Sequence, residues 1–267
     1  MIYLDHNATT PVRPEVFEVM IPYLTEQWGN PSSSYKFGSK LRSVILAARA
    51  QVAELLGAHP GEIVFTSCAT ESNNTAIHAA LRAHPTKRHL ITSAVEHSSV
   101  LNYCAALEQV GYRVTYLPVD SEGLLSLCDL EHSITADTAV VSLMWANNET
   151  GVLFPVGEVA AICRSQNVLY HCDAVQAVGK LGIDLRKVPI DYLSLTGHKI
   201  HAPKGVGALY VRRQAPSYPY LHGGHQERGL RGGTEAVPLI VALGAAAQYA
   251  DGQLPTYKEV VVSLRDD

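Results

Sequence analysis

The sequence has little excess charge, few cysteines and no long apolar run. Its formal net charge of -4 provides no basic footprint for nucleic acid, which is therefore not an expected partner. No apolar run approaches the ~18 residues that a membrane-spanning helix needs. The N-terminus lacks the basic and apolar segments that are typical of a signal peptide. We expect a cytoplasmic protein without a membrane partner.

The cysteine pattern excludes two further classes of protein. The cysteines are odd in number and form no C-x-x-C pair, which is typical of reduced thiols rather than of a disulfide framework or a zinc site. His198 and His201 have a spacing that metal sites use, but carboxylate or thiolate ligands are not evident beside them. No metal is therefore expected. The cysteines are Cys68, Cys104, Cys128, Cys163 and Cys172.

Strand-like and helix-like segments alternate along most of the chain. This alternation predicts βαβ units and an α/β fold with a mostly parallel sheet flanked by helices. A Rossmann nucleotide-binding module is a weaker alternative, because no G-x-G-x-x-G motif follows the first strand. The expected strands are residues 63–65, 90–92, 114–118, 139–144, 168–171, 193–195 and 207–212, with helices beginning near residues 70, 98, 125 and 156.

The two ends of the chain show their own patterns. Residues 1–14 should be extended, and helical spacing follows over residues 15–24. Residues 39–56 have the spacing of an amphipathic helix. An apolar helix over residues 237–249 is expected to lead into a short polar tail. The helix at 39–56 should have Ser39 and Gly57 as caps and Arg42, Arg49 and Glu54 on its polar side.

One lysine stands where a predicted strand ends. The stretch 191–199 is an apolar, β-prone run that ends in small polar residues and then presents Lys199. Ligands of open α/β sheets bind at the carboxyl ends of strands, and a partly desolvated lysine there can act as a nucleophile. A solvated loop lysine is the alternative interpretation.

A carboxylate interrupts another strand-like segment, at Asp173. An aspartate at a strand end needs a cationic partner. An aspartate opposite a pyridinium nitrogen, with a lysine on the other side of the ring, is the arrangement of a pyridoxal phosphate site. Period-two alternation directs Cys172 away from Asp173, so we expect Cys172 in the core.

The strand at residues 63–65 runs through a turn into a helix. Free backbone N–H groups and the helix dipole favour an anion at such a helix start. Simple helix capping by Ser67 or Thr70 is the alternative interpretation.

Five motifs carry a family resemblance that covers nearly the whole chain. The sequence resembles the cysteine desulfurases, in the class V aminotransferase branch of the fold-type I pyridoxal phosphate enzymes. The resemblance implies a cofactor-binding large domain over residues 15–250. It also implies that residues 251–267 begin a C-terminal small domain that is otherwise truncated. The motifs are DHNATTP at 5–11, TSCATESNN at 66–74, EH at 96–97, NNETG at 147–151 and GGHQERG at 223–229.

The resemblance also implies roles for individual residues. Lys199 would bind pyridoxal 5'-phosphate covalently and move the substrate proton, while Asp173 keeps the ring protonated. His97 would stack on the ring and assist proton transfer. The remaining positions implied are Asn148 and Gln176 near the phenolate oxygen, and Ala69, Thr70, Thr196 and His198 at the phosphate. Thr234 would reach the phosphate of a partner subunit in a homodimer. Cys68 and His225 replace glycines of the family pattern.

The implied activity is conversion of L-cysteine to L-alanine, with the sulfur held as a persulfide on an enzyme thiol. That sulfur would pass to an acceptor or scaffold protein for iron–sulfur cluster or thio-cofactor assembly. The persulfide cysteine and the arginine for the substrate carboxylate are expected beyond residue 267. The surface that a small domain covers should then be apolar and exposed, which predicts self-association. Another fold-type I lyase, such as a selenocysteine lyase, and a non-catalytic fragment that binds the cofactor remain as alternatives.

Overall fold

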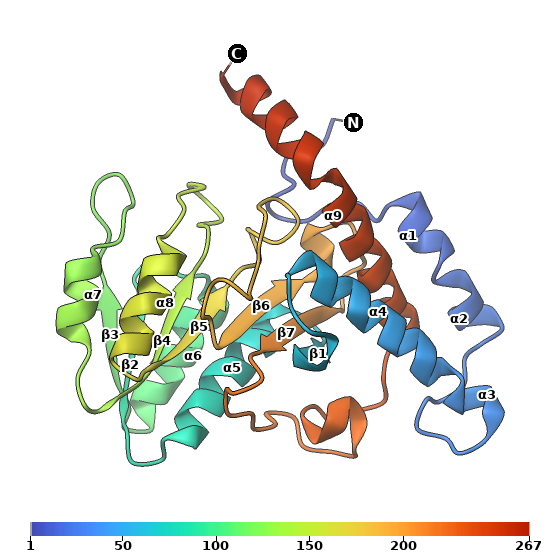
Figure 1. The fold of residues 1–267 in the computed structure, drawn as a ribbon, viewed down its shortest axis with the longest axis horizontal. Coiled ribbons are helices and arrows are strands. Elements are labelled where there is room, and N and C mark those ends of the chain that lie inside the picture. The colour runs from blue at the N-terminus through green and yellow to red at the C-terminus, as the bar shows by residue number, and fades with distance from the viewer. Residues whose placement is uncertain (1, 267) are drawn as a thin grey trace.

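A single mixed sheet forms the centre of the computed structural model, which describes residues 2–266 (Figure 1). Within these residues the sheet has seven strands in the order β1-β7-β6-β5-β4-β2-β3. The strands are β1 (Ile63–Thr66), β2 (His89–Ser93), β3 (Arg113–Leu117), β4 (Thr138–Met144), β5 (Leu169–Asp173), β6 (Tyr192–Thr196) and β7 (Gly207–Val211).

Most of the sheet is parallel, as predicted. Strands β3, β2, β4, β5 and β6 pair in parallel, whereas β7 is antiparallel to both of its neighbours. Parallel strands end at the same edge of a sheet, and that edge is the usual ligand-binding edge of open α/β sheets. The topology therefore brings the ends of β4, β5 and β6 together.

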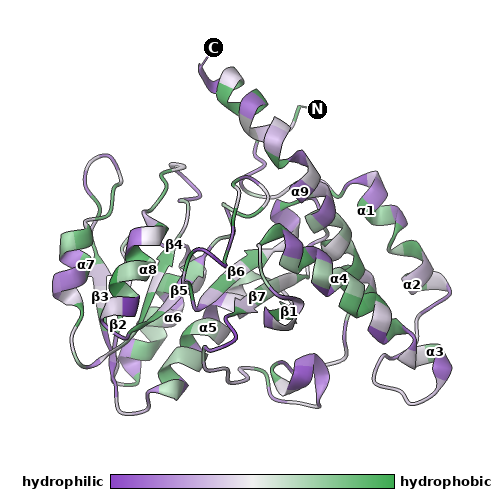
Figure 2. Cartoon of the chain, viewed as in Figure 1, coloured by the Kyte–Doolittle hydropathy of each residue, from purple (hydrophilic) through white to green (hydrophobic). Residues whose placement is uncertain are grey.

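Helices cover both faces of the sheet. The sheet has one hydrophobic core on each face, and successive strand residues point to opposite cores. Leu90 and Val140 pack with α5 and α6, whereas Ile91 and Val141 pack on the opposite face with α4, α8 and α9. Figure 2 shows apolar residues concentrated in the strands and along α4 and α9, which pack side by side. The helices are α1 (Pro14–Glu18), α2 (Ile21–Thr25), α3 (Lys36–Ser39), α4 (Leu41–Leu55), α5 (Ala69–Ala83), α6 (Ser98–Gln109), α7 (Leu127–Ser133), α8 (Val156–Ser165) and α9 (Val237–Asp266), with short 3-10 turns η1 (Pro60–Glu62), η2 (Gly197–Lys199) and η3 (Gln226–Gly229).

Helix α4 differs from its prediction in two ways. Ser39 belongs to α3, so it does not cap α4, whose first flanking residue is Lys40. Arg49 was expected on the polar side but is 5% exposed. Its guanidinium pairs with Glu227, a contact between segments far apart in the sequence that helical spacing does not show. Gly57 follows the helix with a φ of +59°, as a glycine C-terminal cap requires.

Both ends of the chain also depart from their predictions. The segment predicted as one helix over residues 15–24 forms two short helices, and Pro22 lies in the first turn of the second. Helix α9 does not end in a polar tail; it continues to Asp266 through Pro255. Extending an existing helix adds one hydrogen bond per residue, so the loss at a single proline is tolerated. The last turns project from the body (Figure 1). No helix within residues 2–266 is both long enough and apolar enough to cross a bilayer.

Candidate active site

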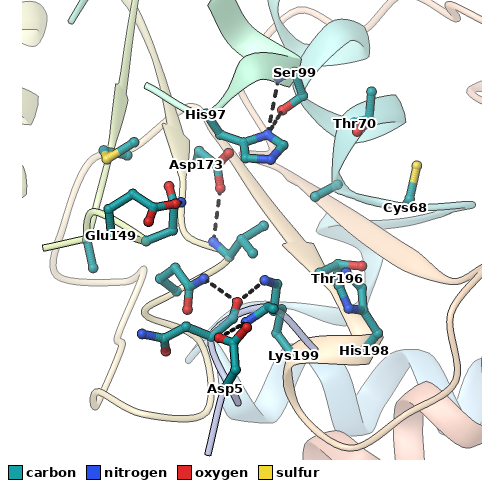
Figure 3. A pocket seen from close by; sticks show the side chains of 18 residues that line it. Asp5, Cys68, Thr70, His97, Ser99, Glu149, Asp173, Thr196, His198 and Lys199 are labelled. Carbon is teal, nitrogen blue, oxygen red and sulfur yellow. Dashed lines mark hydrogen bonds between the residues drawn. The ribbon is translucent and has the colours of Figure 1, made fainter. Parts of the chain in front are cut away.

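A cavity of about 420 Å³ opens where β4, β5 and β6 end. It brings together every predicted site residue except Thr234 (Figure 3). The N-terminal segment, the starts of α5 and α6 and the strand ends all contribute to its wall. The lining residues with polar side chains are Asp5, Asn7, Cys68, Thr70, His97, Ser99, Asn148, Glu149, Asp173, Gln176, Thr196, His198 and Lys199.

Lys199 lies in the tight turn η2 that follows β6, and it is half-buried. Its Nζ donates a hydrogen bond to the carbonyl oxygen of Asn7 in the N-terminal segment. Burial lowers the pKa of Lys199, and the nearby carboxylates of Asp5 and Asp173 oppose this shift. The amine is therefore more easily deprotonated than a surface lysine, which suits a nucleophile.

Asp173 ends β5 and is 6% exposed. Its Oδ2 accepts a hydrogen bond from Asn73 Nδ2 at 2.8 Å, and its Oδ1 accepts one from the Val175 N–H at 3.0 Å. Burial raises the pKa of this carboxyl, although both hydrogen bonds oppose the shift. Within residues 2–266 Asp173 takes part in no ion pair. A buried carboxylate of this kind suits a cationic ligand atom such as a pyridinium N–H.

His97 stands at the start of α6 with its ring beside Asp173 (Figure 3). Its Nδ1 accepts hydrogen bonds from the Ser99 N–H at 3.1 Å and from the Ser99 hydroxyl at 2.8 Å. The Ser99 hydroxyl oxygen in turn accepts one from Asn73 Nδ2 at 2.9 Å. Sequence reasoning assigned no role to Asn73 or Ser99, and the only signal was that both lie within or beside a family motif.

The start of α5 forms the opposite end of the cavity. Cys68 is the residue before the helix, and its side chain makes no capping hydrogen bond. The capping interpretation for Ser67 and Thr70 is therefore wrong: Ser67 instead donates its backbone N–H to Glu71 Oε2 at 2.8 Å. The amides of Ala69 and Thr70 donate no hydrogen bond within the described part of the chain. Open amides at the start of a 15-residue helix favour an anion.

Thr196 and His198 line the same end of the cavity. His198 Nδ1 lies 3.2 Å from the hydroxyl of Thr9, and burial lowers the pKa of the imidazole. Thr234, by contrast, is exposed in a separate hollow that it shares with Ser67, Glu227 and Arg231. Its role at the phosphate of a partner subunit stays a prediction.

Asn148 and Gln176 occupy the side wall. Asn148 Nδ2 donates to Glu149 Oε1 at 2.6 Å, and Gln176 Nε2 donates to the carbonyl oxygen of Asn7 at 3.0 Å. Lys180 contacts Gln176 from outside the cavity lining, and its Nζ donates to Gln176 Oε1 at 2.6 Å. Burial and the nearby charge of Lys199 lower the pKa of Lys180 to about 8. Lys180 is therefore a second amine of altered basicity near the site.

The cysteines divide by accessibility. Cys104, Cys163 and Cys172 are buried, and Cys172 lies in the core as predicted. Burial raises the pKa of both Cys104 and Cys163 to about 12, so these thiols do not ionise near neutral pH. Cys128 is exposed on α7, and Cys68 lines the cavity at the start of α5.

Comparisons with known proteins agree with this geometry. Residues 2–259 match the Aminotransferase class-V family model. The chain is 55% identical to "Cysteine desulfurase 2" of Trichormus variabilis, covering 100% of this chain and 67% of the relative. It is 51% identical to "Cysteine desulfurase NifS" of Azotobacter vinelandii, covering 99% of this chain and 66% of the relative. The chain thus spans about two thirds of the length of the curated relatives that it matches.

Solved structures give the same result. A structure titled "NIFS-LIKE PROTEIN" superposes with a TM-score of 0.93 at 44% identity, covering 96% of this chain and 71% of that one. A second, titled "SspA in complex with cysteine", has a TM-score of 0.90 at 41% identity and covers 98% of this chain and 78% of that one.

Proposed function

Because the chain belongs to the class-V aminotransferase family, we propose that it acts as a pyridoxal 5'-phosphate-dependent cysteine desulfurase. One observation carries the proposal: Lys199 and the buried carboxylate of Asp173 face one cavity at the ends of adjacent strands. This cofactor requires a lysine that bonds to it covalently and an acidic partner for its ring nitrogen.

The residues of the cavity fit the cofactor at three points. Asp173 offers a buried negative charge without an ion-pair partner among residues 2–266. The open amides of Ala69 and Thr70 suit a phosphate. Lys199 lines the same cavity and offers an amine of lowered pKa. When bound, pyridoxal phosphate supplies an electron sink for negative charge that develops at the substrate Cα.

The protein side of the reaction follows from these positions. We propose that the Asp173 carboxylate, oriented by Asn73, holds the proton on the ring nitrogen. Lys199 Nζ, once neutral, accepts the proton from the substrate Cα and returns it when L-alanine forms. His97 offers Nε2 toward the cavity because Ser99 holds Nδ1 as an acceptor.

L-Cysteine is the proposed substrate, and the neighbour whose title names a complex with cysteine supports this choice. Attack of an ionised cysteine thiol on the substrate sulfur forms the S–S bond of a persulfide and breaks the Cβ–S bond, whose electron pair takes up a proton as L-alanine forms. The step therefore requires an ionisable, accessible cysteine. Cys104, Cys163 and Cys172 are buried, Cys68 lies at the phosphate end, and Cys128 is exposed on α7, away from the residues that line the cavity. We therefore propose that the acceptor thiol is none of the five cysteines of this chain.

The assembly is also part of the proposal. We propose a homodimer in which Thr234, exposed and away from its own cavity, contacts the phosphate site of the partner subunit. A sulfur-acceptor or scaffold protein for iron–sulfur cluster assembly would receive the product sulfur. A cytoplasmic location fits the five free thiols.

The direct test is an assay of the purified chain with pyridoxal phosphate and an excess of dithiothreitol, a dithiol that can accept the substrate sulfur in place of a protein thiol and release it as sulfide. L-Cysteine and L-selenocysteine are supplied in parallel, and alanine is measured together with sulfide or selenide. Equal amounts of alanine and sulfide from L-cysteine, lost in Lys199→Ala, are the expected result. Turnover of L-selenocysteine alone would identify a selenocysteine lyase instead. Absence of any product, with the cofactor bound, would identify a binding fragment without turnover.

A further inference from the structure

The outer edge of β1 is closed by charged side chains rather than by another strand. Within residues 2–266, β1 lies at the end of the sheet and pairs only with β7, so the backbone groups of alternate residues point away from the sheet. The Phe65 N–H donates to Glu227 Oε2 at 2.9 Å. The carbonyl of Ile63 accepts from Arg49 Nη1 at 2.7 Å and from Arg228 Nη2 at 2.8 Å. The loop over residues 223–234 is thereby fixed along this edge.

The same edge continues into the turn that begins α5. The next outward group, the Ser67 N–H, donates to Glu71 Oε2 at 2.8 Å. Arg231 from the loop donates through Nε to Glu71 Oε1 at 2.9 Å and through Nη2 to Oε2 at 3.2 Å. The Glu71 side chain is 8% exposed and that of Arg231 is 24% exposed. Glu71 therefore connects the turn to the loop through one largely buried carboxylate.

The negative charge of the Glu71 carboxylate lies where it would oppose the binding of an anion at the start of α5. Glu71 lies in the first turn of α5, beside the open amides of Ala69 and Thr70. Burial raises its pKa, but the hydrogen bonds from Arg231 and Ser67 more than offset burial, so its pKa is lowered and it is ionised at neutral pH. An uncompensated negative charge there would repel a phosphate group. Arg231 supplies the compensating positive charge.

We propose that Glu71 and Arg231 are positioning residues for the cofactor phosphate. Glu71 holds the Ser67–Thr70 turn in its anion-binding shape through the Ser67 N–H, and Arg231 both fixes Glu71 and cancels its charge. Neither residue lines the cavity, so each acts through the turn rather than by contact with the ligand. This inference rests on the proposed function, because it assumes that the phosphate lies at the start of α5.

The test compares two ligands that differ only in the phosphate. Dissociation constants for pyridoxal 5'-phosphate and for pyridoxal are measured by absorption titration on the wild-type chain and on Arg231→Met. We expect Arg231→Met to weaken binding of the phosphorylated ligand by about tenfold and to leave pyridoxal binding within about twofold. The ³¹P chemical shift of the bound phosphorylated ligand should also move toward its value in free solution.

Further variants separate charge from folding. Arg231→Lys keeps the positive charge and should recover most of the affinity. In Arg231→Met/Glu71→Gln the neutral amide still accepts from Ser67, so the double variant should bind the phosphorylated ligand more tightly than Arg231→Met alone. The matched control is Arg186→Met, which removes an exposed ion pair with Asp184 and should change neither constant. Far-UV circular dichroism verifies that each variant is folded.

Two results would overturn the inference. If Arg231→Met weakened the binding of both ligands equally, Arg231 would have a general structural role. If neither dissociation constant changed, Arg231 would have no role in binding. In both cases a wild-type preference for the phosphorylated ligand would leave the proposed function intact. A wild-type chain that binds the two ligands equally would instead overturn the phosphate site, and the inference with it.

Discussion

The Nδ2 amide of Asn73 donates hydrogen bonds both to Asp173 Oδ2 at 2.8 Å and to Ser99 Oγ at 2.9 Å. Ser99 in turn donates to His97 Nδ1 at 2.8 Å. One buried amide on α5 therefore orients the carboxylate at the end of β5 and the imidazole at the start of α6. These two groups would contact the pyridine ring from different sides.

Removing this amide should weaken the ring end of the site. In Asn73→Ala, the charged carboxylate of Asp173 loses the hydrogen bond from the Asn73 amide. We therefore expect pyridoxal and pyridoxal phosphate to bind about tenfold more weakly. Both ligands should respond equally, in contrast to the effect expected at Arg231. Absorption titration of the wild type and of Asn73→Ala with each ligand gives the dissociation constants. Asn102→Ala, an exposed asparagine on α6, is the control, and unchanged pyridoxal binding in Asn73→Ala would refute the role assigned to the amide.

The buried pair between Arg49 and Glu227 should dominate the stability of the β1 edge. Both guanidinium Nη atoms lie 2.6 Å from the carboxylate oxygens. Breaking a buried pair leaves one charge without compensation, so Arg49→Met should lower the free energy of unfolding by about 3–5 kcal/mol. The exposed pair removed by Arg186→Met should cost less than about 1 kcal/mol. Urea denaturation gives both values, and equal small losses would contradict the burial of the pair.

Acid should destabilise the sheet through His171. This histidine is buried, with its ring nitrogens 2.8 Å from Ser142 Oγ and 2.9 Å from Ser194 Oγ, and burial lowers its pKa to about 3. Below the unfolded pKa of 6.5 the unfolded chain binds a proton that the fold excludes. This contribution to stability is therefore complete above pH 6.5 and is lost as the pH falls toward 3, by up to about 1.4 kcal/mol per pH unit.

The measurement for His171 is a difference between variants. Glu96 is buried and its pKa is raised to about 8, so it acts in the opposite direction over part of this range. The free energy of unfolding of the wild type and of His171→Asn is followed from pH 7 to pH 5, with the exposed His132→Asn as control. We expect the free energy of unfolding of His171→Asn to increase, relative to that of the wild type and of His132→Asn, as the pH falls from 7 to 5. Parallel curves for all three would contradict the assignment.

The end of α9 should cause self-association. Tyr257, Val260, Val261 and Leu264 recur at helical spacing and are 40%, 50%, 43% and 72% exposed. An exposed apolar stripe of this kind favours association. Sedimentation velocity should show concentration-dependent oligomers that Val260→Lys/Leu264→Lys reduces and that Leu46→Lys, an exposed leucine on α4, does not. A monomer at every concentration would refute this prediction.

The sheet and the position of Lys199 were predictable because both depend on local patterns. Alternating segments indicate parallel strands, and strand ends in such sheets meet at one edge. Burial of Arg49 was not predictable, because its partner Glu227 lies on a distant loop. The helical end of α9 was missed because the residues after Tyr249 were interpreted as a polar tail, whereas they extend an established helix that tolerates Pro255.

The candidate site divides in the same way. Residues at strand ends and helix starts, such as Asp173 and Ala69, could be placed from the sequence. Asn73 and Ser99 could not, because their roles depend on hydrogen bonds between helices. Glu71 and Arg231 likewise meet only after the loop packs on β1. Thr234 lies outside its own cavity, so its proposed role depends on a second subunit.

Reduction of the bound cofactor identifies the lysine to which it bonds. The chain is incubated with pyridoxal phosphate, reduced with borohydride, digested and examined by mass spectrometry. The label should lie on Lys199 and should be absent from Lys199→Ala. Lys180 is the natural competitor, since its pKa is lowered to about 8 and its amine donates to Gln176, which lines the cavity. A label on Lys180 in the wild type, or the same yield in Lys199→Ala, would refute the role proposed for Lys199.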